Sequence, residues 1–417
     1  MLFHPIAKNW SAKMKQKYKN KINYWRKRVI PRIIRTTFFY ICYPVLFFVP
    51  IKRDKIVVSN FNGQGYGDNP KYICEYLLSQ NEALDIVWLI DEKRMKNAQA
   101  FPSSIRLVSL TSFRALYELH TAKIWIDNCR KNIYPKKRKN QFYIQTWHAS
   151  FSLKMMERLV EDKLPPKYVK RAKKDSKMCD LLIFESANTI SDVPYNFWYQ
   201  GEMFRNGTPR GDIFINYDER LVRKVYDHYN IDYHKKIVMY APTFRQGYDL
   251  EVDITFLERI TQTFEKRFVD SYVMLVRLHP NDIKNKERIL GRSLPQNIID
   301  ASDYEDMQEL LCATDTLITD YSSSSGEALI SEKKCFIYAY DYKEYNKDRG
   351  LLIDLENLPF PVSTNQEELI NQVRNFSKSD YLEKVEHFKK IYNVFETGHA
   401  SQDIGNRILQ EMGQVKR

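Results

Sequence analysis

The chain has 417 residues, with 65 Lys and Arg against 52 Asp and Glu, so its net charge is +13. A hydrophobic content of 43%, which includes 14% aromatic residues, is enough to build a sizeable core. With 13 Gly and 16 Pro, the composition excludes a collagen-like, low-complexity or disordered chain. At roughly 100–200 residues per domain, the length indicates two or three globular domains.

The excess positive charge lies at the start of the chain. Residues 1–53 contain 13 Lys and Arg and no acidic residue, whereas the rest of the chain is formally neutral. A nucleic-acid enzyme usually spreads its basic surface along a binding channel. The confined charge therefore argues against a nucleic-acid partner.

This basic arm ends in an apolar, aromatic run at residues 38–51, which Pro44 interrupts. A spanning helix needs about 20 apolar residues, and a signal peptide needs a small-residue cleavage site after the run. The run either packs into the core or lies in a membrane interface, where aromatic side chains reach headgroup depth and basic residues attract anionic lipid. Because charge and aromatic residues adjoin, we expect residues 1–53 to attach the protein peripherally to an anionic membrane surface.

The six cysteines are widely spaced and form no C-x-x-C pair. This usage is typical of reduced thiols in the cytoplasm and indicates neither a disulfide framework nor a zinc site. The membrane surface in question is therefore expected to be the cytoplasmic face. No Walker loop and no H-E-x-x-H spacing occurs in the sequence, so we expect neither a metal nor another cofactor.

Short apolar runs alternate with longer segments of helical spacing after the arm. The sequence predicts buried strands at residues 55–59, 85–90, 123–126, 141–145, 180–184, 236–240, 272–276, 316–319 and 334–338. Helices are expected at residues 70–81, 112–120, 253–268, 304–312 and through most of the tail from 366 onward. This alternation is typical of α/β domains with parallel sheets covered on both faces. We expect two doubly wound, Rossmann-like domains, residues 54–225 and 226–417, that face each other across a cleft.

Ligands of such sheets bind beyond the carboxyl ends of the strands. Gly63, Gly65 and Gly67 follow the first predicted strand, but their spacing favours a close-approach loop over a dinucleotide site. His148 and His279 each follow a predicted strand, one in either domain. A single histidine at such a position is often structural, but two indicate a shared cleft in which a near-neutral pKa suits proton transfer.

A Ser-rich segment at residues 319–327 also follows a predicted strand. One serine would suffice to cap the helix that begins there, and four in a row favour a diphosphate site at the positive end of the helix dipole. Arg210, Arg245 and Arg277 lie at strand ends or turns. Each alone is typical of a surface charge, whereas together they are suited to clamp phosphoryl oxygens.

Six motifs occur in a fixed order, at residues 66–71 (YGDNPK), 147–150 (WHAS), 207–212 (GTPRGD), 241–245 (APTFR), 277–280 (RLHP) and 319–323 (TDYSS). Together they resemble the CDP-glycerol glycerophosphotransferase family, whose members act in the synthesis of teichoic acid and related glycerol- or ribitol-phosphate polymers. The resemblance extends over about residues 55–400. It implies a GT-B arrangement, with the acceptor on the first domain and the CDP-alditol donor on the second.

The resemblance also implies roles for individual residues. His148 corresponds to the base of the family, and His279 to a second catalytic histidine. With Arg245 added as a member of the clamp, the expected donor-binding residues are Ala149, Ser150, Arg210, Pro242, Thr243, Arg245, Arg277, Leu278, Ser322, Ser323 and Glu327. Ala149, Ser150 and Glu327 stand where the family has Gly, Thr and Asp, and a bulkier loop beside the base can alter the choice of acceptor or alditol.

The expected activity is transfer of glycerol phosphate from CDP-glycerol to a hydroxyl of a lipid-linked acceptor, with release of CMP. Two alternatives within the transferases are a CDP-ribitol donor and a nucleotide-sugar glycosyltransferase of the same architecture. A non-catalytic, nucleotide-binding protein of the membrane surface is an alternative of another class. The presence of both histidines argues against that last alternative.

Overall fold

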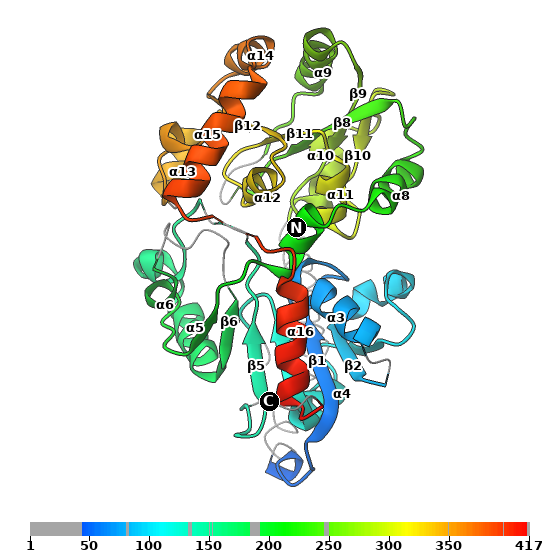
Figure 1. Ribbon diagram of the computed structural model, residues 1–417, viewed down its shortest axis with the longest axis vertical. Coiled ribbons are helices and arrows are strands. Elements are labelled where there is room, and N and C mark those ends of the chain that lie inside the picture. Colours follow the sequence, from blue (N-terminus) through cyan, green and yellow to red (C-terminus); the bar gives the residue numbers. More distant parts are fainter. Residues whose placement is uncertain are drawn as a thin grey trace, which may run out of the picture.

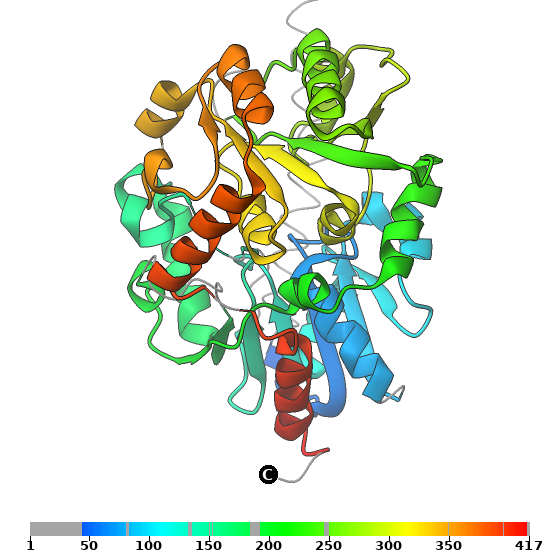
Figure 2. The same cartoon turned by 45° about the horizontal axis from the view of Figure 1, so that its top comes forward.

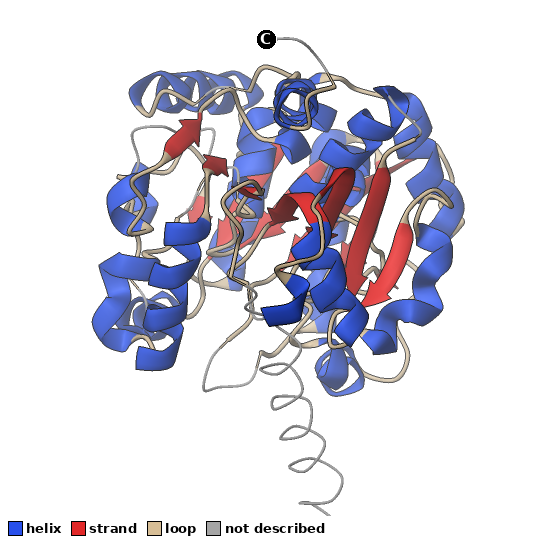
Figure 3. Cartoon of the chain, turned by 90° about the horizontal axis from the view of Figure 1, so that it is seen from below, coloured by secondary structure: helices blue, strands red, loops and turns tan. Residues whose placement is uncertain are grey.

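Neighbouring strands run parallel in both sheets of the molecule. The computed structural model describes residues 44–414, apart from 81–82, 132–135, 150, 152, 184–191, 246–249, 349 and 395. Its strands form a seven-stranded and a six-stranded sheet, one in each of two lobes stacked along the long axis (Figure 1). Helices lie outside the strands (Figure 3). The prediction of two doubly wound domains is confirmed.

The first sheet has the strand order β3-β2-β1-β4-β5-β6-β7. Its strands are β1 (Lys52–Ser59), β2 (Asp85–Ile90), β3 (Arg106–Ser109), β4 (Ala122–Asp127), β5 (Phe142–Gln145), β6 (Leu181–Ile183) and β7 (Glu202–Phe204). The helices and 3₁₀ helices of this lobe are α3 (Asp68–Gln80), η2 (Glu92–Ala100), α4 (Phe113–Thr121), η3 (Glu157–Lys163), α5 (Pro166–Met178), α6 (Val193–Asn196) and η4 (Pro209–Gly211). The last five residues of β1 are all buried, as expected for a central strand with helices on both faces.

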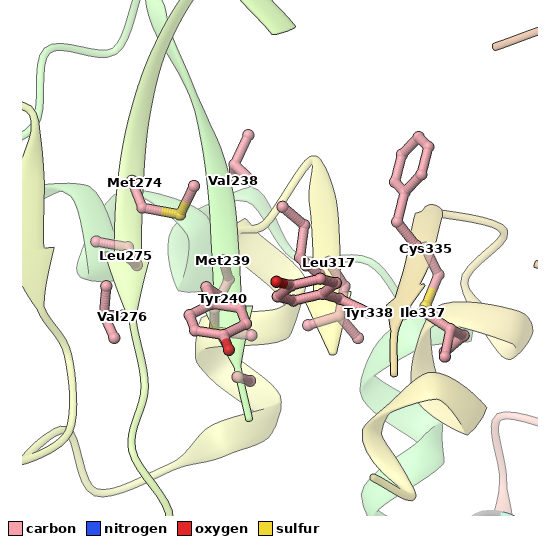
Figure 4. Close-up of a cluster of buried hydrophobic side chains, with 14 of the residues drawn as sticks. Val238, Met239, Tyr240, Met274, Leu275, Val276, Leu317, Cys335, Ile337 and Tyr338 are labelled. Atoms are coloured by element: carbon pink, nitrogen blue, oxygen red, sulfur yellow. The ribbon is translucent and has the colours of Figure 1, made fainter. Parts of the chain in front are cut away.

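The second sheet has the strand order β10-β9-β8-β11-β12-β13. Its strands are β8 (Lys235–Ala241), β9 (Ser271–Val276), β10 (Ile298–Asp300), β11 (Thr316–Thr319), β12 (Lys334–Tyr338) and β13 (Val362–Ser363). Apolar side chains of β8, β9, β11 and β12 form part of its core (Figure 4).

The helices that follow η4 are mostly in the second lobe. They are α7 (Asp212–Ile215), α8 (Glu219–Tyr229), α9 (Ile254–Phe268), η5 (Ile283–Asn285), α10 (Lys286–Leu290), α11 (Met307–Ala313), α12 (Ser324–Ile330), α13 (Tyr342–Asp348), η6 (Leu355–Asn357), α14 (Gln366–Arg374), α15 (Lys378–Ile391) and α16 (Ala400–Glu411). Among the described residues, none of these or the earlier helices is both long and apolar enough to span a bilayer.

Both sheets reverse their strand order beside the strand that comes first in sequence. The reversals lie between β1 and β4 in one sheet and between β8 and β11 in the other. A crevice opens beyond the carboxyl ends of the strands at such a point. The loops that follow these four strands are therefore the part of the fold that is positioned to bind a ligand.

The domain boundaries differ from the prediction, since the boundary at residues 225 and 226 falls inside α8, whose Val225 and Tyr226 pack into the core of the second domain. Helix α16 was expected in the second domain, but its Ile404 and Ile408 pack with Ile56 and Ile73 in the core of the first. Figures 1 and 2 show this helix, in red, against the first lobe. Strand β1 begins at Lys52, so the predicted end of the arm at residue 53 lies inside the sheet. A composition shift marks the charge boundary of the arm but carries no information on strand pairing.

The chain also crosses between the lobes after residue 149. Phe151 and Leu153 pack into the core of the second domain. The N–H of Leu352 donates to the carbonyl of Leu153 at 2.7 Å. A Cβ on Gly326 in α12 would lie 2.6 Å from the ring of Phe151, so the close approach of this segment to α12 needs a glycine there.

Candidate active site

A cleft of about 560 Å³ lies between the two domains, where their switch points face each other. Ten of the predicted site residues line it: His148, Arg210, Pro242, Thr243, Arg277, Leu278, His279, Ser322, Ser323 and Glu327. Strand ends pointed to the histidines, the serines and the arginines, and the resemblance to the family supplied the other residues of this set. The structure adds the contacts that decide what each of these side chains can do.

His148 follows β5 and is only partly exposed. Its Nδ1 lies 2.6 Å from the main-chain carbonyl oxygen of Asn128. A carbonyl oxygen can only accept, so Nδ1 carries the proton and Nε2 is the unprotonated nitrogen. Burial lowers the pKa of His148 below its ordinary value, and the bond to Asn128 opposes that shift only in part. The ring is therefore a neutral imidazole with its basic nitrogen at Nε2.

Aromatic contacts fix the orientation of the His148 ring. The ring stacks on Trp147 at a centroid distance of 4.4 Å and contacts Phe61 at 5.1 Å. Trp147 has a φ of 49°, a left-handed conformation that costs of order 1–3 kcal/mol in a bulky residue. The Trp147 N–H donates to the side chain of Gln145 at 3.0 Å, and its carbonyl accepts from Asn69 at 3.2 Å. These bonds hold the loop in the conformation that presents His148.

His279 follows β9 in the second domain and is exposed. The main-chain N–H of Asn281 donates to Nδ1 of His279 at 3.2 Å. A nitrogen that accepts a hydrogen bond carries no proton, so the proton of this ring is on Nε2. His279 is therefore the opposite tautomer of His148 and presents an N–H donor.

Arg277 lies two residues before His279 and also lines the cleft. Its Nη1 donates to three main-chain carbonyls, those of Ala301 at 2.7 Å, Ser302 at 3.3 Å and Tyr304 at 2.5 Å. No ion pair among the described residues includes Arg277. Burial lowers its pKa, but a guanidinium still remains charged near neutral pH. The site thus holds a fixed cation outside any such ion pair, although the nearby carboxylates of Asp306, Glu305 and Asp303 favour its charged form.

Arg210 has a different environment. It is buried in η4, and its guanidinium donates to Asp68 of the first domain at 2.7 Å and to Glu327 of the second. Burial lowers its pKa, but Glu327 and Asp68 outweigh that effect and raise it overall. Because both carboxylates compensate its charge, Arg210 joins the two walls of the cleft and positions Glu327.

The serines at the start of α12 cap the helix only in part, through Ser322. Ser323 is the N-cap residue, and its side chain makes no capping hydrogen bond. The Oγ of Ser322 accepts from the Ser324 hydroxyl at 2.9 Å and from its N–H at 3.2 Å. Ser322 and Ser323 are half-buried and line the cleft beside Glu327.

Arg245 was expected to contact the donor, and the structure corrects this prediction. Its side chain does not line the cleft and instead forms buried ion pairs with Asp320 and Asp341. It also donates to the carbonyl and hydroxyl of Thr243, each at 2.7 Å. The carboxylate of Asp320 accepts from the Thr243 N–H at 3.0 Å. Arg245 therefore stiffens the loop that follows β8, and its donors are not available to a phosphate.

The two expected donor contacts after His148 have different outcomes. Ala149 is buried in the core of the first domain and does not line the cleft. Ser150 lies outside the described residues. The same limit applies to residues 1–43 of the arm.

Sequence reasoning missed the polar residues that support the site. Asn69 donates to the carbonyls of Thr146 and Trp147, and its side-chain oxygen accepts from the Arg210 N–H at 3.0 Å. Asp68 and Asn69 lie in the YGDNPK motif, so the motif was visible but its partners, more than 70 residues away, were not. Among the described residues, no group of three or more His, Cys, Asp or Glu side chains is placed to hold a metal ion.

The fold and the cleft define a GT-B protein, with a basic histidine on one domain and a cation beside a second histidine on the other. The sequence profile described as CDP-Glycerol:Poly(glycerophosphate) glycerophosphotransferase matches residues 41–410. The chain belongs to this family. The resemblance found in the six motifs is thereby confirmed.

Individual relatives extend the comparison. The chain is 30% identical over 382 residues to the teichoic acid poly(glycerol phosphate) polymerase of Staphylococcus epidermidis, a match that covers 87% of this chain and 51% of that protein. It therefore spans about half the length of that relative. It is 27% identical over 402 residues to the teichoic acid glycerol-phosphate transferase of Staphylococcus aureus, covering 92% of this chain and 98% of the relative.

The fold also matches a solved structure. A variant of the wall teichoic acid polymerase TagF, soaked with CDPG, has a TM-score of 0.75 and 27% sequence identity. The match covers 96% of this chain and 98% of that one. The GT-B fold class expected from the motifs is confirmed.

Proposed function

We propose that the protein transfers glycerol phosphate from CDP-glycerol to an acceptor hydroxyl and releases CMP. The observation that carries this proposal is the pair of histidines, which line one cleft from two domains and have opposite tautomers. Such a pair supplies a proton acceptor on one side of a reacting phosphorus and a hydrogen-bond donor on the other. Membership of the family and the fold shared with a relative soaked with CDPG support the choice of donor.

In the proposed reaction, Nε2 of His148 takes the proton of the acceptor hydroxyl. The acceptor oxygen forms a bond to the phosphorus that carries glycerol, and the bond from this phosphorus to the oxygen shared with CMP breaks. Negative charge develops on that departing oxygen. The Nε2–H of His279 and the guanidinium of Arg277 stabilise this charge, which is where most of the catalysis of phosphoryl transfer arises.

The donor lies on the second domain in this proposal. Ser322 and Ser323 donate to the diphosphate, and the loop of Pro242 and Thr243 follows the adjacent strand of the switch point. Glu327 accepts from ribose hydroxyls, and the hydrogen bond that Arg210 donates to it holds its carboxylate in place. Leu278, which lies between Arg277 and His279 in the chain, is buried and anchors this segment to the core.

A CMP-release assay tests the proposal. The purified full chain is given CDP-glycerol, CDP-ribitol and common UDP-sugars, each with a small polyol acceptor. CMP release from CDP-glycerol that depends on acceptor is the expected result. Release from CDP-ribitol alone or UDP from a sugar nucleotide would reassign the donor, and binding of CDP-glycerol without release under any condition would support a non-catalytic protein.

We also propose that the acceptor is lipid-linked and that the arm attaches the protein to the cytoplasmic face of an anionic membrane. The described end of the arm supports this. Arg138 donates to the carbonyls of Val49 at 2.6 Å and Phe47 at 3.0 Å, which holds the segment on the first domain. Phe48 is 88% exposed and Val45 63%, so these side chains do not pack into the core.

Removal of residues 2–43 tests this attachment, since it leaves β1 intact. Co-sedimentation with anionic vesicles is expected to fall, and the fall is expected to shrink as added salt screens the contribution of Lys and Arg. Turnover on a small water-soluble acceptor should survive. A truncated protein that melts at a lower temperature, or that binds vesicles as well as the full chain, would contradict the attachment.

A further inference from the structure

The segment of residues 301–306, which leads into α11, fixes the guanidinium of Arg277. Nη1 of Arg277 donates to three main-chain carbonyls of this segment at 2.5–3.3 Å. A main-chain carbonyl moves only with its segment. Whatever holds residues 301–306 in place therefore also sets the direction in which Arg277 presents its other N–H donors to the cleft.

The first domain holds the end of this segment. Lys71 of α3 donates to the carboxylate of Asp306 at 2.5 Å, and the hydroxyl of Tyr72 donates to the same oxygen at 2.9 Å. The other oxygen of Asp306 accepts from the N–H of Gln308 at 2.9 Å and so caps α11. Each domain thus uses one oxygen of Asp306, and this carboxylate ties the segment to the first domain.

The contact between Lys71 and Asp306 is buried and charged. Lys71, Asp306 and Glu309, to which Lys71 also donates at 2.8 Å, are each at most 5% exposed. Burial lowers the pKa of Lys71, but the nearby carboxylates, Asp306 first among them, outweigh that effect and raise it overall. Lys224 donates to Glu309 as well, but from α8 of the second domain and with an exposed side chain. A buried ammonium stays with its carboxylates, so Lys71 keeps Asp306 in one position.

We propose that Lys71 is a positioning residue for Arg277. It holds Asp306, and with it the segment whose carbonyls direct the guanidinium at the oxygen that leaves with CMP. This inference rests on the proposed function, in which Arg277 stabilises the charge on that oxygen. Lys71 does not line the cleft, so it acts through the segment and not on the substrate. A displacement of about 1 Å at a catalytic group can cost about 10²-fold in rate, so a remote contact of this kind affects turnover.

A double-mutant cycle tests the proposal. Lys71→Met, Arg277→Met and the double variant are compared with the wild-type chain in kcat/KM for CDP-glycerol, measured by CMP release. Lys71→Met is expected to lower kcat/KM by about 10- to 100-fold. In the Arg277→Met background the same change is expected to cost less than about threefold, because both substitutions remove one and the same interaction. Losses that multiply would overturn the proposal, since a merely structural role of Lys71 would act in either background.

Two further variants separate positioning from stability. Lys224→Met takes a cation from the same Glu309 but leaves the contact with Asp306, and it is expected to keep kcat/KM within about twofold of the wild type. Lys71→Met leaves two buried carboxylates short of a cation, which lowers stability as well. Tyr72→Phe removes one hydrogen bond to Asp306 and no charge, so it replaces Lys71→Met in the cycle if that variant does not fold. Its expected loss of about three- to tenfold must likewise vanish in the background without the guanidinium.

Hydrogen exchange of the full chain gives a readout that needs no turnover. The amides of residues 301–306 are expected to exchange faster in Lys71→Met than in the wild type and in Lys224→Met. Unchanged exchange in Lys71→Met would overturn the proposal, as would a loss of activity in Lys224→Met as large as that in Lys71→Met. If the wild type releases no CMP from CDP-glycerol, the proposed function fails, and faster exchange confined to this segment still supports the positioning of Arg277.

Discussion

The two walls of the cleft present the same side chain in opposite chemical states. His148, on the first domain, is half-buried against Trp147 and donates from Nδ1 to a carbonyl. His279, on the second domain, is exposed and accepts at Nδ1 from an N–H. The main-chain partner of Nδ1, at 2.6 Å in His148 and 3.2 Å in His279, decides whether Nε2 can take a proton or donates one.

Replacement of His148 by Gln tests whether the histidine of the first wall is the base. The amide nitrogen of Gln reaches about as far as Nε2 but cannot accept a proton. We expect turnover to fall by about 10²–10⁴-fold, with the Kd for CDP-glycerol nearly unchanged because the base acts on the acceptor. Steady-state CMP release and donor binding on the same sample measure both. A variant that keeps more than half of the wild-type turnover would remove His148 as the base.

The second prediction separates a supporting arginine from a ligand-binding one on the second wall. Arg245→Met leaves Asp320 and Asp341 buried without their cation. We expect a loss of about 3–5 kcal/mol in the free energy of unfolding, measured by urea denaturation. Arg277→Met is the matched control, since no described carboxylate loses a partner, and it should lower turnover with a smaller change in stability. If Arg245→Met lowered turnover without a loss of stability, Arg245 would instead be a donor-binding residue.

His279→Gln tests whether the histidine of the second wall acts only as a hydrogen-bond donor. The Gln amide keeps an N–H donor, which is the group that the observed tautomer of His279 presents. We expect turnover within about tenfold of the wild type, equivalent to about 1.4 kcal/mol, and a larger loss for His279→Ala. If Gln and Ala were equally inactive, His279 would have to exchange a proton and not only donate a hydrogen bond.

The pH profile gives the smallest but most specific effect. Burial lowers the pKa of His148 from its ordinary value of 6.5, so the neutral, basic ring persists as the pH falls below that value. The acid limb of kcat/KM is therefore expected to have its midpoint below 6.5, and to stay there in His279→Gln. A midpoint above 6.5, or one that moves with His279→Gln, would place the titrating group elsewhere.

The sequence predicted the parts of the fold that depend on local pattern. Strands β2, β11 and β12 begin and end where their apolar runs do. All four edge strands were missed: β7, β10 and β13, with three, three and two residues, have too few positions to show a period, and β3 has one buried residue in four and so no continuous apolar run. The return of α16 to the first domain was also missed, since an amphipathic helix does not encode which lobe it covers.

The same division applies to the site. Both histidines and the serines of α12 follow strands, so their position at the cleft was predictable. The carbonyl of Asn128 that sets the tautomer of His148 lies 20 residues away, and Glu327, which binds Arg210, lies 117 residues away. Main-chain partners and long-range ion pairs of this kind depend on the assembled fold, and no spacing in the sequence contains them.

The opposite tautomers can be measured directly by nitrogen NMR of the full chain labelled with ¹⁵N-histidine at neutral pH. Signals of the two rings are assigned from the His148→Gln and His279→Gln variants. The account predicts a proton on Nδ1 and a bare Nε2 in His148, and the converse in His279. Finding the same nitrogen protonated in both rings would contradict the division of roles between the two walls.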